Sequence, residues 1–185
     1  MMKPYRIYKT TLIILTVILS SCNTQPPAKK ENVAELKWSV KMANSIMNRS
    51  DSLIYYVDRN PKWAYDVAYL GMAIDRLGNI DPKYSKYMED WVHYFVRPDG
   101  SVIDYRKEGF NLDRIFPGRN VMTVYHRTNE IKYRYALDNL INQLKDHPKT
   151  KSGGYWHKKI YPWQMWLDGI FMGSTFMVRY AAEFN

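Results

Sequence analysis

Apolar residues recur with helical spacing through most of this chain, from about residue 33 to its end. In the first such segment Leu36, Val40 and Met47 fall on one face of a helix. Strand patterns are sparse, and only Ser101–Arg106 is expected to be extended. The pattern predicts an all-α chain whose helices are separated by breakers rich in Pro, Gly and Asn. After the first segment, helices are predicted at Ala64–Leu77, Tyr84–Phe95, about Val121–Arg127, Ile131–Leu144 and Gly169–Ala182.

Two of these segments open alike, which indicates a repeat of helical hairpins. Asp81–Tyr87 and Asn129–Tyr135 each place a Lys-Tyr pair near the start of the helix. Hairpins in such an array need neighbours to bury their faces, and closing the array into a ring removes its exposed ends. The expected fold is an (α/α)6 toroid, or six-hairpin barrel, of which this chain supplies about half. Because the last helix runs to Phe184–Asn185 without a capping glycine, residues 33–185 are expected to be the N-terminal part of a longer domain.

The first 22 residues have the pattern of a bacterial lipoprotein signal peptide. A basic start is followed by the apolar stretch Leu12–Leu19, which is too short to span a bilayer. Leu19–Cys22 resembles a lipobox, so we expect cleavage before Cys22 and a lipid anchor on it. An ordinary secretory signal with a chance cysteine is the alternative. Residues 23–32 read as a flexible tether that would hold the domain to a membrane, in the periplasm or at the outer membrane and cell surface.

Composition excludes several classes of function. The chain has 27 Lys and Arg against 18 Asp and Glu. The cations are scattered rather than gathered in a stripe, so no nucleic-acid partner is expected, although a positive surface suits an acidic sugar. Cys22 is the only cysteine, and the folded part therefore has no disulfide, no cysteine metal site and no thiol nucleophile.

The segment Tyr161–Met172 places one carboxylic acid, Asp168, among aromatic and apolar residues just before a helical pattern. Desolvation by such neighbours raises the pKa of a carboxyl group, which keeps it protonated for acid catalysis. Asp168 is therefore the candidate general acid and base. The alternative is a helix N-cap, since Asp is common before an apolar helical run.

Four segments together resemble the unsaturated rhamnogalacturonyl hydrolases of glycoside hydrolase family 105, and the likeness spans about residues 35–182. One departure is Ala68, where that family often has glycine. The segments are Trp63–Asp66, the aspartate-then-Pro-Gly-Arg run Phe110–Arg119, the Gly-Gly-aromatic-aromatic-His-Lys run Gly153–Lys158, and Tyr161–Met172.

The resemblance implies an (α/α)6 barrel and a hydrolase that removes a Δ4,5-unsaturated uronic acid from the non-reducing end of pectin fragments. In that family the double bond is hydrated, one carboxyl group acts as acid and then as base, and no metal or organic cofactor is needed. Asp168 takes that place in this sequence. The expected partner is therefore an unsaturated uronic-acid oligosaccharide.

The resemblance also implies roles for other residues. Asp113 would orient the attacking water or bond a sugar hydroxyl, the alternative being a salt bridge to Arg114 or Arg119. His157 would bond the sugar or its carboxylate, although a histidine among aromatic residues is often structural. Trp166 and Tyr65, with Trp63 as a further candidate, would form walls for the sugar ring. Arg119 is a candidate to bind the substrate carboxylate.

Two alternative functions remain open. Glycoside hydrolase family 88 performs the same hydration on unsaturated glucuronyl ends of glycosaminoglycan or gellan fragments, although the wording of Gln164–Gly169 favours family 105. A lipid-anchored sugar-binding protein without turnover is the second alternative. It predicts that replacing Asp168 has no effect, whereas an enzyme would lose turnover.

Overall fold

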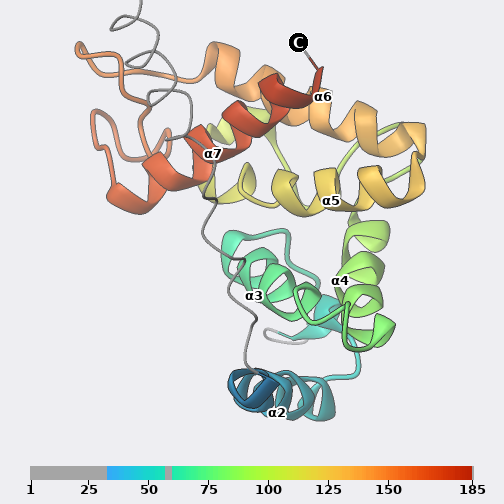
Figure 1. Ribbon diagram of the computed structural model, residues 1–185. Coiled ribbons are helices and arrows are strands. Elements are labelled where there is room, and N and C mark those ends of the chain that lie inside the picture. The colour runs from blue at the N-terminus through green and yellow to red at the C-terminus, as the bar shows by residue number, and fades with distance from the viewer. Residues whose placement is uncertain (1–32, 57–59, 185) are drawn as a thin grey trace, which may run out of the picture. The chain divides into compact units, whose positions relative to one another are not determined.

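The computed structural model describes residues 33–56 and 60–184, and every regular element in them is a helix, as predicted (Figure 1). The described residues before Ser39 belong to a different compact unit from those that follow, and the contacts below lie within the larger unit. Three short 3-10 turns lie between the helices: η1 (Leu53–Tyr55), η2 (Lys107–Gly109) and η3 (Leu112–Arg114). The described α-helices are α2 (Val33–Arg49), α3 (Tyr65–Asp75), α4 (Pro82–Phe95), α5 (Gly118–Thr128), α6 (Ile131–Asp146) and α7 (Leu167–Phe184).

Each predicted helix is found, and local sequence explains where the clearest ones begin and end. Pro82 starts α4, and the Asp81 side chain caps it by accepting a bond of 2.9 Å from the backbone N–H of Lys83. At the other end of the next helix, α5 stops where Asn129 takes a left-handed backbone with φ 55°. The turn that follows is short, so α5 and α6 lie side by side (Figure 1).

Ser101–Arg106 does not form the expected extended segment. Val102 makes one isolated bridge to the end of α4, and the chain then turns through Asp104, whose φ is 60°. The Asp104 carboxylate accepts bonds from the backbone N–H of Trp63 at 3.2 Å and from the side chain of Arg114 at 2.6 Å. It thereby joins the segment before α3 to the segment before α5.

The predicted repeat is visible in equivalent contacts of two tyrosines. Near the start of α4, the Tyr84 hydroxyl donates to Asn44 Oδ1 of α2 at 2.8 Å. Near the start of α6, the Tyr133 hydroxyl lies 3.3 Å from His93 Nδ1 of α4. The even-numbered helices are therefore linked one to the next, as the hairpin repeat of a ring requires.

The odd-numbered helices form a second series. α3 packs against α5, and α5 packs against α7, while each also contacts its even-numbered neighbour. The amide of Asn120 on α5 donates to the carbonyl of Ala68 on α3 at 3.0 Å, in the buried interior. Two layers of helices in this order agree with an (α/α) toroid.

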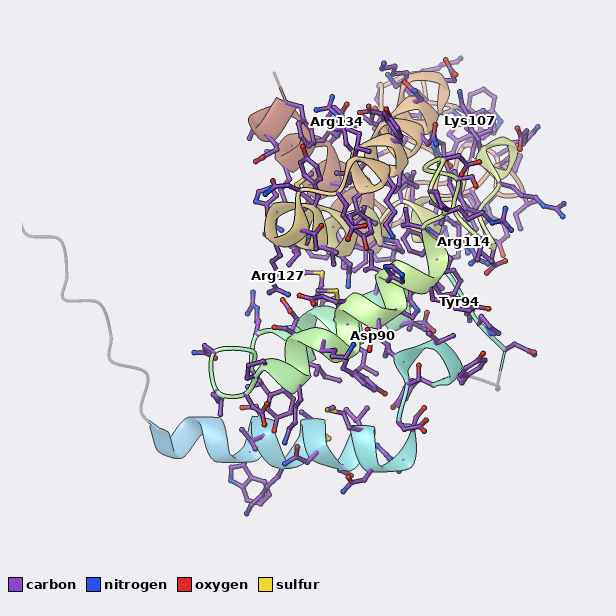
Figure 2. All side chains as sticks on the ribbon, turned by 90° about the vertical axis from the view of Figure 1, so that its right-hand side faces the viewer. Asp90, Tyr94, Lys107, Arg114, Arg127 and Arg134 are labelled. Carbon is purple, nitrogen blue, oxygen red and sulfur yellow. The ribbon has the colours of Figure 1, made fainter. Side chains whose placement is uncertain are left out.

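Aromatic packing and one arginine join α3, α4 and α5. Trp63 and Trp91 stack with ring centroids 4.9 Å apart, and both are fully buried. Arg127, labelled in Figure 2, lies on α5. It pairs with Asp75 of α3 at 2.7 Å and with Glu89 of α4 at 2.8 Å. The arginine therefore bridges the ends of α3 and α5 to the middle of α4.

Residues 1–32, with the predicted signal peptide, Cys22 and the tether, lie outside the described residues. None of the described helices combines the length and the apolarity needed to cross a membrane.

Candidate active site

The segments that carry the sequence motifs precede the odd-numbered helices. Trp63 lies just before α3, Asp113 lies before α5, and His157 lies in the long connection before α7. Backbone bonds join the last two segments: Leu112 N–H donates to the His157 carbonyl at 3.1 Å. The fold thus brings together residues that are more than 40 positions apart in the sequence.

Asp113 lies at the centre of a small polar cluster. Its Oδ2 atom is 2.6 Å from Lys158 Nζ, and its Oδ1 atom is 3.2 Å from His157 Nε2. The second contact lacks the alignment of a hydrogen bond, so Oδ1 is a buried acceptor with no donor among the described residues. The turn is held by Asn111, whose side chain accepts from Asp113 N–H at 2.9 Å. One carboxylate oxygen therefore lies in the buried interior without a hydrogen-bond donor among the described residues.

His157 is buried within a layer of aromatic rings. Its ring stacks on Trp166 with centroids 4.1 Å apart, and Trp166 also stacks with Tyr161 at 5.2 Å. Burial, more than any other cause, lowers the pKa of His157; Asp113 and Asp168 oppose that effect, and Lys158 adds to it. The ring is therefore neutral at neutral pH, so one ring nitrogen can donate a hydrogen bond and the other can accept one.

Gly169 allows the His157 ring to lie directly against the start of α7. A Cβ atom at position 169 would come within 2.7 Å of His157 Nδ1, which has no hydrogen-bond partner among the described residues. Asp168 lies next to this contact, in the first turn of the helix. His157 therefore has Asp113 on its Nε2 side and the first turn of α7 on its Nδ1 side.

The predicted enclosure of Asp168 is wrong. Its side chain is exposed, and so are the neighbouring Trp163 and Phe171, at 63% and 44%. The connection before α7 folds back on His157 through Trp163, whose φ is 66°, instead of covering Asp168. The N-cap alternative is also wrong, because Asp168 lies inside α7 and its Oδ1 atom accepts from the adjacent Gly169 N–H at 2.8 Å.

The predicted sugar walls differ in how much surface they offer. Tyr65 and Trp166 are 40% and 39% exposed, although stacking on His157 occupies part of the flat surface of Trp166. Trp63 is 0% exposed, because it stacks on Trp91 in the core. The prediction that Trp63 contacts the substrate is therefore corrected: it is a core residue.

Arg119, in the first turn of α5, is a buried cation that no acid neutralises within the described residues. It is 9% exposed, and its guanidinium lies over the rings of Phe116 and Phe171 at 5.4 and 5.2 Å. Its one side-chain bond, to Thr175 Oγ1, is 3.4 Å long, and its Nε atom has no partner. Burial lowers the pKa of Arg119, and Arg179 and Arg76 lower it further.

The sequence did not reveal the partner of Asp113. Arg114 pairs with Asp104 and Arg119 packs on aromatic rings, so neither forms the salt bridge considered for Asp113. Lys158 does so instead, from the position after His157. A basic residue directly after His157 is visible in the sequence. Whether its side chain points toward Asp113 depends on how the connection before α7 folds. In the described part of the chain no group of His, Cys, Asp and Glu is placed to hold a metal ion.

Comparison with known proteins agrees with the helical fold. The family model described as Glycosyl Hydrolase Family 88 matches residues 38–185. A solved structure of a glycoside hydrolase from family 105, from C. acetobutylicum ATCC 824, is 37% identical and superimposes with a TM-score of 0.70. The match covers 80% of this chain and 40% of that one, so the chain spans less than half of that enzyme's length. With most of its length matched, this chain belongs to glycosyl hydrolase family 88 and shares its fold with a family 105 enzyme.

Proposed function

We propose that this chain carries the acid–base residues of a hydrolase that removes a Δ4,5-unsaturated uronic acid from rhamnogalacturonan oligosaccharides. The observation that carries the proposal is the cluster of Asp113, His157 and Lys158 beside the first turn of α7, where Asp168 is exposed to an incoming ligand. Family membership and the likeness to a family 105 enzyme support the glycosidase class. The amino-acid sequence of Gln164–Gly169 favours the rhamnogalacturonyl substrate.

The substrate is already activated for hydration. Its double bond between carbons 4 and 5 is an enol ether, and carbon 4 accepts a proton from a neutral carboxylic acid while positive charge develops at carbon 5. Water then adds to carbon 5 and returns its proton to the same carboxylate. The resulting hemiketal opens and releases the next sugar, so one water molecule is consumed and the acid is regenerated. Asp168 is the group proposed for both proton transfers.

An exposed Asp168 fits this chemistry only if the substrate changes its surroundings. General acid catalysis requires the carboxyl group to carry its proton when it meets carbon 4. A sugar ring lying against the exposed surface of Trp166, two residues away, would remove water from Asp168 and favour its protonated form. Substrate binding itself would thereby prepare the acid.

Asp113 and His157 are proposed to hold the reacting groups. Lys158 occupies Asp113 Oδ2, which leaves Oδ1 to accept a bond from the attacking water or from a sugar hydroxyl. The neutral His157 ring can donate or accept one further bond at the sugar. Together they would fix the direction from which water approaches carbon 5.

Arg119 is proposed to attract the substrate carboxylate. Its guanidinium lies on the ring of Phe171, one turn beyond Asp168 on α7, and Arg76 and Arg179 add positive potential around it. A buried guanidinium without an acidic partner is a strong attractor for a carboxylate.

The same chain would be held to a membrane through lipid on Cys22, as the sequence of its first 22 residues suggests.

Turnover of the unsaturated sugar tests the proposal. The chain from residue 23 onward is mixed with an unsaturated rhamnogalacturonan disaccharide, and in a second arm with an unsaturated glucuronyl disaccharide, while the ultraviolet absorbance of the enol ether is followed. We expect absorbance loss in the first arm, none with Asp168→Asn, and an unchanged rate with Asp90→Asn, a matched replacement at an exposed aspartate of α4.

Each other result has a defined meaning. Absorbance loss only in the glucuronyl arm would replace the rhamnogalacturonyl substrate with a glucuronyl one. If the absorbance is unchanged in both arms, the enzymatic proposal is overturned, and calorimetric binding of the disaccharides would then favour a sugar-binding protein.

A further inference from the structure

A buried polar network lies next to the segments that carry Asp113 and His157. None of its hydrogen bonds involves the side chain of Asp113 or Asp168. Its centre is Gln143, near the end of α6, which is 0% exposed and accepts a bond of 2.9 Å from the Tyr105 hydroxyl. The Gln143 amide nitrogen lies 3.3 Å from the Asn111 carbonyl and 3.3 Å from His147 Nδ1. His147, 3% exposed, places its Nε2 atom 2.7 Å from the Trp156 carbonyl.

The partners fix every proton in this network. The Trp156 carbonyl can only accept, so His147 Nε2 carries the proton and Nδ1 is the acceptor. The two hydrogens of the Gln143 amide then point to Nδ1 and to the Asn111 carbonyl, and its oxygen accepts from Tyr105. Turning the amide over would set two oxygens against each other at Asn111. Every polar group of Gln143 and His147 is therefore satisfied in one arrangement.

The two carbonyls that the network holds lie next to the candidate site. Trp156 immediately precedes His157, and Asn111 forms the turn that places Asp113. The segments are also joined directly, since Leu112 N–H donates to the His157 carbonyl at 3.1 Å. The Phe110 and Tyr155 rings each form a T-shaped contact with the His147 ring, with centroids 5.5 and 5.2 Å away.

We infer that His147 and Gln143 are positioning residues for this site: they set the distance between Asp113 and His157 by clamping the backbone carbonyl beside each. The inference rests on the proposed function for its catalytic consequence, although the clamp itself is a property of the fold. Neither residue touches the substrate. Both come from the end of α6, so that helix sets the spacing between the segments before α5 and α7.

The test compares His147→Phe and Gln143→Leu with His126→Phe, the same replacement at an exposed histidine of α5. Backbone hydrogen exchange is followed by NMR at the Leu112 and His157 amides, with the α4 amides as reference. We expect exchange at both site amides to quicken about tenfold or more in the two network variants while the α4 amides keep their rates. His147→Gln, which restores a side-chain N–H donor, should recover part of the protection.

Unchanged protection at Leu112 and His157 would overturn the inference, and so would an equal acceleration at every amide, because that indicates only a loss of global stability. In turnover assays the network variants should lose about tenfold in kcat with little change in KM. If the wild-type chain turns over neither disaccharide, the proposed function fails, but the exchange experiment still decides whether the clamp exists.

Discussion

Burial and three nearby charges together set the pKa of His157. Burial is the main reason why its pKa is low, and Asp113 and Asp168 act against burial while Lys158 acts with it. Two single replacements should therefore move the pKa of this histidine in opposite directions.

Asp113→Asn removes the negative charge 3.2 Å from the ring and should lower the pKa of His157 further. Lys158→Met removes a positive charge and should raise it. The measurement is an NMR titration of the His157 ring protons, with exposed His93 as an internal control. Shifts of the same sign in both variants would contradict the charge arrangement described here.

Gly169→Ala should destabilise the chain by about 1–3 kcal/mol, because the new methyl group would meet the stacked His157 ring at 2.7 Å. In most helix positions this replacement stabilises, since alanine is the better helix former by about 1 kcal/mol. Gly173→Ala is the matched control, because its Cβ atom would lie no closer than 3.3 Å to a methyl group of Leu112. Urea unfolding compares the two, and equal stabilities would show that His157 does not need this glycine.

At the scale of the helices, the tyrosine contacts of the repeat make a separate prediction. Tyr84→Phe and Tyr133→Phe each remove one hydroxyl contact between even-numbered helices and should each cost about 1 kcal/mol. Because the two sites share no partner, the double variant should lose the sum of the two within about 0.5 kcal/mol. Urea unfolding of the three variants measures this, and a double variant no less stable than either single one would contradict independent links.

The helices could be predicted from the sequence because their apolar spacing is local information. Even the repeat was visible, as Tyr84 and Tyr133 occupy equivalent contacts. The surroundings of the site residues could not be predicted from the residues beside them in the sequence. Aromatic residues flank Asp168 along the chain, yet their rings point elsewhere and leave it exposed. Burial of Trp63 and pairing of Asp113 with Lys158 likewise depend on how separate segments meet.

For the whole molecule, the buried histidines predict how stability changes with pH. Burial lowers the pKa of both His147 and His157 below the usual 6.5. The unfolded chain therefore binds more protons than the folded chain just below pH 6.5, and stability must fall as the pH drops through that value. The carboxyls with lowered pKa values, Asp81, Asp99 and Asp146, titrate below 3.8 and do not affect this window.

Urea unfolding between about pH 7.5 and pH 5 measures this dependence. His147→Phe should show a smaller loss over the same range, because it removes one of the two groups. A free energy of unfolding that stays constant over this range in the wild-type chain would contradict the buried, neutral histidines.

Asp168 is proposed to protonate carbon 4 of an unsaturated uronic acid. This role is tested most directly by running the reaction with the unsaturated rhamnogalacturonan disaccharide in heavy water and examining the released uronic acid by mass spectrometry and NMR. Hydration predicts one solvent deuterium on carbon 4, and no product with Asp168→Asn. A product without deuterium at carbon 4, or an Asp168→Asn variant that still forms the labelled product, would contradict this role.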